Sequence, residues 1–186
     1  QKEYIEKHIA THTAHSAEDR SAVSYLESVL NPEGRIRTSF SCDDKWPNHD
    51  GFFEYVSNPD ISKIPKQNFI VQIKGTHDFS ENNGVISYCL KSLSFPAFIA
   101  NEVTADPGIL FVVLNPDTRN GKRIFWKVMS KSFLSDIDFE KSSKTIKFSP
   151  EDEIKNTDES IELFCERLDS IIDTHLFLNK LNSEIG

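Results

Sequence analysis

The 186-residue chain has little cysteine and no long apolar run, and each of these absences excludes a class of protein. Its three cysteines lie far apart and form no CxxC pair, which argues against a zinc ribbon or a disulfide framework. No apolar stretch approaches the roughly 20 residues that a membrane-spanning helix needs. The chain also lacks a basic-then-apolar leader of the secretory kind. We therefore expect a cytoplasmic protein with no membrane partner.

Nucleotide-binding motifs are absent as well, because the sequence contains neither a P-loop nor a GxGxxG segment. It has no internal repeat and no low-complexity stretch. What it does contain is a hydrophobic fraction of 38% with 14 phenylalanines, which indicates one globular domain with a sizeable core. Since the chain begins at Gln1, an initiator methionine is expected to precede it.

The net charge of −8 at first opposes binding to nucleic acid, because phosphate contacts require lysine and arginine. The charge is uneven, however. Residues 119–147 hold eight basic and three acidic side chains, whereas residues 148–186 hold three basic and ten acidic ones. A basic stripe beside an acidic helix is compatible with a DNA-binding face. Two ordinary solvated faces of opposite sign would give the same count.

Hydrophobic periodicity predicts a mixed α/β arrangement. Ser16 and Asp19 resemble a capping box, so a helix is expected to begin there and to stop at residues 32–34. Asn120-Gly121 is typical of a hairpin turn. Strands are expected at residues 35–41, 51–56, 69–74, 85–90, 109–114 and 123–129, a short helix at 94–103, and a long amphipathic helix at 157–181.

This order of elements predicts three regions. Residues 1–15 form an N-terminal arm, either helical or loose. Residues 16–148 form the α/β domain itself. Residues 149–186 form an acidic linker and a C-terminal helix that packs on the same domain.

The residues best suited to chemistry lie on and beside the strand at 69–74. Side chains alternate along a strand, so Gln72 and Lys74 share one face. An amide and an ammonium on a buried strand need a partner or a task. Asp50 opens the strand at 51–56 and could face the same side, as could Glu54. A carboxylate and an amide oxygen suit Mg²⁺, and an ammonium can stabilise charge on a phosphate.

Structural roles compete with this hypothesis. Asp50 could cap a turn before a glycine. Lys74 could extend to solvent from the end of its strand, or pair with an acid such as Glu54.

The segments NHDGFFEYV and NFIVQIKGT resemble the PD-(D/E)XK nuclease superfamily, the restriction-endonuclease-like proteins. In that pattern an acid opens the second core strand and an (E/D/Q)-x-K motif follows on the third. Asp50 and then Gln72-Ile73-Lys74 match it. The likeness covers about residues 16–130 and is strongest to a bacterial, defence-associated branch with a D-G-x-x-E and Q-x-K motif. It implies a mixed β-sheet flanked by helices and a DNA endonuclease that uses Mg²⁺ or Mn²⁺.

The resemblance also implies roles for particular residues. Asp50, Gln72 and Glu18 would bind the metal, with the main-chain carbonyl of Ile73 as a further ligand, and Lys74 would act in catalysis. The accessory candidates are Glu54 and His77, and Glu27 is the weaker alternative to Glu18.

Two departures from the family pattern affect this interpretation. His49 stands where the motif has proline, and Gln72 stands where it usually has Glu or Asp. A neutral amide binds a cation less tightly, so an inactive nuclease fold that only binds nucleic acid or a protein is the alternative. The resemblance further implies double-stranded DNA as partner, and a homo-oligomer or a place in a larger polypeptide.

Overall fold

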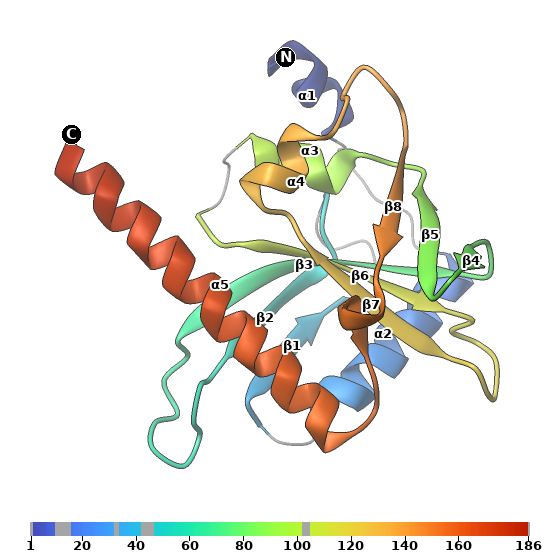
Figure 1. The fold of residues 1–186 in the computed structure, drawn as a ribbon, viewed down its shortest axis with the longest axis horizontal. Helices are drawn as coiled ribbons and strands as arrows, with labels where there is room; N and C mark the ends of the chain where they lie inside the picture. The colour runs from blue at the N-terminus through green and yellow to red at the C-terminus, as the bar shows by residue number, and fades with distance from the viewer. Residues whose placement is uncertain (1, 10–15, 32–33, 42–46, 102–104, 186) are drawn as a thin grey trace.

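The structure is a computed structural model that describes residues 2–9, 16–31, 34–41, 47–101 and 105–185. The side chains of residues 176–180 and 182 are not described. A six-stranded mixed sheet lies at its centre, in the order β1-β2-β3-β6-β7-β9 (Figure 1). Strands β3 and β6 are parallel, and the other neighbours are antiparallel. The strands are β1 (Ile36–Phe40), β2 (Gly51–Tyr55), β3 (Gln67–Thr76), β6 (Gly108–Leu114), β7 (Arg123–Val128) and β9 (Glu153–Ile154).

A second, smaller antiparallel sheet covers one face of the main sheet, in the order β4-β5-β8. Three short helices lie on the same side (Figure 1). Together they enclose a core to which Leu110, Val112 and Leu114 of β6 contribute. These elements are β4 (Ser80–Asn82), β5 (Val85–Leu90), β8 (Lys144–Phe148), α1 (Lys2–His8), α3 (Ser94–Ala100) and α4 (Lys131–Ser135).

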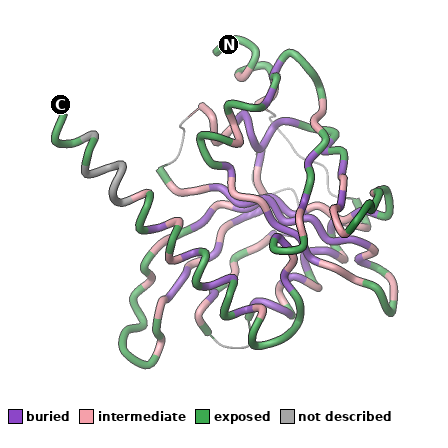
Figure 2. The backbone as a smooth tube through the Cα atoms, viewed as in Figure 1, coloured by how far each residue is buried: buried purple, intermediate pink, exposed green. Residues whose placement is uncertain are grey.

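Two longer helices, α2 (Ala17–Leu30) and α5 (Asp158–Ile185), cover the opposite face. They pack on the other set of alternating side chains of the central strands, such as Phe69, Val71 and Ile73 of β3. Because both faces are covered, β6 is buried along its whole length. Figure 2 shows the buried residues in purple at the centre of the molecule.

Helix α5 is anchored by aromatic packing and by charge. Phe164 meets Trp126 edge-on, with ring centroids 4.7 Å apart. Asp169 accepts hydrogen bonds from the Tyr55 hydroxyl at 2.9 Å and from Lys66 at 3.0 Å. Beyond these contacts the helix continues past the sheet toward the C-terminus (Figure 1).

The structure confirms the expected α/β class, a mixed sheet flanked by helices with a long C-terminal helix. Sequence patterns did not indicate β4, α4, β8 or β9. The segment expected as an acidic linker contains a 3-10 helix (Pro150–Asp152) and β9, which forms an edge of the main sheet. The expected arm includes α1, whose neighbour is α3; residues 10–15 and 102–104 lie outside the described part of the chain.

The basic segment does not gather on one face. Lys122 lies beside α2, whereas Lys144 and Lys147 lie on β8, across the main sheet. Arg123 and Lys127 are paired with acids, at 2.9 Å in each case. Of the two interpretations of the charge pattern, ordinary solvated faces therefore fit these positions better. No helix in the described part of the chain is both long and apolar enough to cross a bilayer.

Candidate active site

The site lies where β3 extends beyond β2. Strand β2 begins with Gly51 opposite Val71, so in the described chain no strand pairs with residues 72–76 on that edge. The Val71 carbonyl already faces this edge, where it accepts the Asp50 amide at 2.8 Å. Backbone groups of Ile73 and Gly75 point the same way, because direction alternates along a strand. These donors need partners from elsewhere.

Asp50 supplies the first partner. Its Oδ2 accepts the Ile73 amide at 2.6 Å, and the residue is 1% exposed. The chain turns sharply after it, since Gly51 has φ +125° and any Cβ there would lie 2.2 Å from the Ser39 carbonyl oxygen. Glycine at this position therefore lets the Asp50 side chain reach the edge of β3.

Asp19 supplies the second partner. It is the third residue of α2 and forms a capping box with Ser16. Its Oδ1 accepts the Gly75 amide at 2.8 Å, and its Oδ2 lies 3.5 Å from Lys74 Nζ. This contact requires α2 to approach β3 closely, because a Cβ on Gly75 would lie 2.3 Å from the Glu18 carbonyl oxygen. Gly75 is thus needed to bring the helix acid to the strand.

The two carboxylates consequently sit on successive outward-facing amides of one strand edge. Residues two apart along a strand are separated by about 7 Å, which sets the spacing of the amides that hold Asp50 and Asp19. Lys74 lies between these amides, and its side chain is only 16% exposed. The result is a compact group of two acids and one amine at the end of a buried strand.

Gln72 adds an amide to the same strand and shares the face of Lys74. It lies opposite Leu110 of β6 and is 1% exposed. Neither its Oε1 nor its Nε2 has a hydrogen-bond partner among the described residues. Leaving a buried polar group unsatisfied costs about 1–3 kcal/mol. The amide is therefore the feature of this region that its protein surroundings do not explain.

Two neighbours modify the electrostatics of the site. Burial, and then the nearby Asp19 carboxylate, raise the pKa of Tyr88 on β5 well above its usual range. Burial lowers the pKa of His49, whose Nδ1 accepts the Gly51 amide at 3.2 Å. Both side chains are therefore neutral near pH 7.

The other predicted acids lie elsewhere. Glu18 is not the helix acid that contacts Lys74; that residue is Asp19. Glu54 pairs with Arg37 at 3.8 Å and sits opposite Asn68, six residues from Lys74 along β3, or about 20 Å. The alternative in which Lys74 pairs with Glu54 is therefore ruled out.

Glu27 and His77 also lie away from the acid pair. Glu27 is eight residues beyond Asp19 on α2, about 12 Å along the helix, and burial raises its pKa. His77 follows β3, with Nε2 2.6 Å from Asp117 and Nδ1 3.1 Å from Asn115. These contacts, the Asn115 bond first, raise the pKa of His77.

No group of three His, Cys, Asp or Glu side chains suited to a metal ion occurs among the described residues. The donors near the end of β3 are of another composition: the Asp50 and Asp19 carboxylates and the Ile73 backbone carbonyl at its edge, and the Gln72 amide oxygen on its buried face. All are oxygens, which is the ligand type that Mg²⁺ and Mn²⁺ take.

Comparison of the chain with family models, with curated proteins and with solved structures gives no match in any of the three. Function is therefore inferred from the residues of this chain. Asp19 is the site residue that sequence reasoning missed.

Proposed function

We propose that this chain is a restriction-endonuclease-like nuclease domain that hydrolyses DNA phosphodiester bonds with a divalent metal ion. The observation that carries the proposal is the buried Gln72 amide without a partner in the described chain, beside Lys74 and a strand edge bearing two carboxylates. A polar group kept at such a cost is expected to have a ligand.

The residues present fit Mg²⁺ or Mn²⁺. Asp50, Asp19 and the Gln72 amide oxygen would hold the ion, with the Ile73 carbonyl as a further donor. Two carboxylates would supply the charge that the neutral Gln72 lacks. When bound, such an ion polarises a phosphate oxygen and lowers the pKa of a bound water.

Lys74 is the chain's own contribution to transition-state stabilisation. Its ammonium is held by Asp19 and is only partly exposed, so its charge is less screened than that of a surface lysine. A phosphate entering here would meet this fixed positive charge as negative charge develops on its oxygens. Asp19 therefore has a positioning role toward Lys74 as well as a metal-binding one.

The test is cleavage of plasmid DNA with Mg²⁺ or Mn²⁺. We expect the parent to cleave and Asp50→Asn, Lys74→Ala and Asp19→Asn to lose at least about 100-fold in rate. Glu18→Gln is the matched control for Asp19→Asn, and it should retain activity. Thermal unfolding of each variant separates lost chemistry from lost folding.

Cleavage that is equal in the parent and in Asp50→Asn would refute the proposal. Calorimetric titration with Mn²⁺ gives a second readout, since the parent, Glu18→Gln and Lys74→Ala should bind the ion, whereas Asp50→Asn and Asp19→Asn should not. A role in bacterial restriction or antiphage defence belongs to the same proposal. The test of this role is the efficiency of phage plating on bacteria that express the protein. The parent should lower it, and Asp50→Asn should not.

An inactive nuclease fold that binds nucleic acid or a protein is the second candidate. It is favoured by the backbone bonds of both carboxylates, which give Asp50 and Asp19 a structural role already. Salt-dependent DNA binding without cleavage under any metal would identify this alternative.

A further inference from the structure

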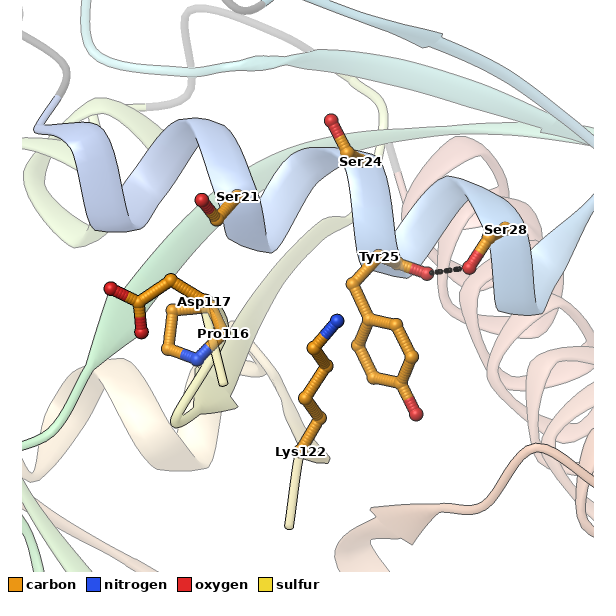
Figure 3. Close-up of a pocket in the computed structure, with 7 residues that line it drawn as sticks. All are labelled: Ser21, Ser24, Tyr25, Ser28, Pro116, Asp117 and Lys122. Carbon is orange, nitrogen blue, oxygen red and sulfur yellow. Dashed lines mark hydrogen bonds between the residues drawn. The ribbon is translucent and has the colours of Figure 1, made fainter. Parts of the chain in front are cut away.

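An open hollow of about 450 Å³ lies between α2 and the connection from β6 to β7. Four residues of α2 and three from the connection between β6 and β7 line it (Figure 3). We call it the α2 hollow. Its lining is polar and apolar in about equal parts, with the hydroxyls of Ser21, Ser24 and Ser28 on one side and the amine of Lys122 on the other.

Lys122 is the positive charge of the α2 hollow. Figure 3 shows it reaching from the β6–β7 connection toward Tyr25, and its Nζ lies 5.0 Å from the centre of that ring. No carboxylate of the described residues lies within ion-pair distance of this amine. The hollow's own acid, Asp117, is instead bound to His77 at 2.6 Å. The ammonium is thus available to an anion.

The serines add neutral donors and acceptors. Ser28 donates to the Tyr25 carbonyl at 2.7 Å, while the corresponding bond of Ser24 to Arg20 is long, at 3.3 Å. Ser21 makes no hydrogen bond within the described part of the chain. One lysine with one or two available hydroxyls is the donor set that proteins use on backbone phosphates of DNA.

The α2 hollow is close to the proposed active site. Both use α2, and with a rise of 1.5 Å per residue Ser21 and Ser28 lie about 3 and 14 Å along the axis from Asp19. Pro116 of the hollow packs against Gly75, the residue whose amide binds Asp19. Phosphates of one DNA strand follow each other about every 3.4 Å along the duplex axis. The hollow therefore lies within a few nucleotides of the acid pair.

We propose that the α2 hollow binds a backbone phosphate of DNA next to the cleaved position, with Lys122 and Ser21 as its donors. This inference rests on the proposed function for its choice of ligand. It identifies a phosphate contact between α2 and the β6–β7 connection, which the sequence motifs do not include.

The test is binding of a fluorescent duplex, followed by anisotropy without divalent metal at several salt concentrations. Lys122→Ala should weaken binding about tenfold and reduce the salt slope by about 1. Ser21→Ala should weaken it less, and Lys122→Arg should restore most of the affinity. The matched control is Lys131→Ala, an exposed lysine of α4 across the main sheet, which should bind as the parent does.

The outcomes separate this inference from the proposed function. Lys74→Ala should lose cleavage. A parent that never cleaves, with Lys122→Ala still defective in binding, would leave the phosphate site standing and refute the nuclease. Equal affinity and slope in Lys122→Ala and Lys131→Ala would overturn the phosphate site, whatever the activity.

Discussion

The residues of the candidate site differ in how much each contributes to the stability of the fold and to the proposed function. Asp50 and Asp19 bind strand amides, so each holds the structure together even without a ligand. The side-chain amide of Gln72 makes no hydrogen bond in the described structure, and its burial carries a desolvation cost. Replacement of Gln72 should therefore separate stability from activity.

We predict that Gln72→Leu raises the free energy of unfolding, measured with urea, by about 1 kcal/mol or more. The same variant should no longer cleave DNA. A leucine of similar size would fill the site opposite Leu110 without burying a polar group. Gln67→Leu is the control on the same strand. Its amide donates to Asn68 and Asp106, so this change should lower stability instead. A less stable, fully active Gln72→Leu would contradict the role given to the amide.

The second prediction at this scale concerns pH. Burial lowers the pKa of His49, so the folded protein binds a proton there less readily than the unfolded chain. The stabilisation is complete above the unfolded value of about 6.5 and is lost as the pH falls from there through the folded value. His49→Asn keeps an acceptor for the Gly51 amide but does not titrate.

Urea unfolding at several pH values tests the pH dependence of stability attributed to His49. Between pH 7 and pH 5 the parent should lose more stability than His49→Asn does. His77 works in the opposite sense, because its pKa is raised in the folded protein. Its contribution to stability is present below the unfolded pKa of about 6.5 and is lost as the pH rises through the folded pKa. Identical pH profiles for the parent and His49→Asn would exclude this effect.

Asp50, Gln72 and Lys74 could be found from sequence because strand parity and strand order bring them to one region. The choice between Glu18 and Asp19 was missed because a capping box already explains Asp19 locally. A signal was nonetheless present. Asp19 lies 3, 4 and 7 residues before the buried positions 22, 23 and 26, so it falls on the helix stripe that faces the sheet.

At the level of elements, the contact between α2 and β3 determines the site. We predict that Gly75→Ala lowers the free energy of unfolding by about 1–3 kcal/mol and reduces cleavage strongly. The new methyl group would meet the Glu18 carbonyl and push α2, with Asp19, away from the strand.

Gly121→Ala is the control for this prediction. It has a positive φ but open space around it, so it should cost about 1 kcal/mol of backbone strain and leave activity unchanged. Denaturation and plasmid cleavage measure both effects. Full activity in Gly75→Ala would show that the close approach of α2 is not required.

Sequence patterns predicted the elements whose secondary structure is determined by their own residues. The capped helix, the apolar strand at 108–114 and β3 have strong local patterns. Strands β8 and β9 are short and carry polar residues, and they exist because β5 and β7 offer them free edges. Pairing of this kind depends on the tertiary structure and cannot be read from a local window.

For the molecule as a whole, α5 completes the core on the α2 side of the sheet. We predict that Phe164→Ala lowers the free energy of unfolding by about 3–5 kcal/mol, since Phe164 packs between Trp126 and Phe111. The adjacent Leu163 is 62% exposed, so Leu163→Ala should change stability by less than about 0.5 kcal/mol. Equal effects of the two changes in chemical denaturation would mean that α5 is not part of the folding unit.

The parallel pairing of β3 with β6 has a consequence for synthesis of the protein. Asp19, Asp50, Gln72 and Lys74 are all translated before residue 108, where β6 begins. A ribosome-bound chain of that length already holds every reactive side chain but lacks the strand that fixes β3 in the middle of its sheet. Non-local pairs of this kind form late. If the proposed nuclease function holds, chains that are still being synthesised would therefore not cut DNA.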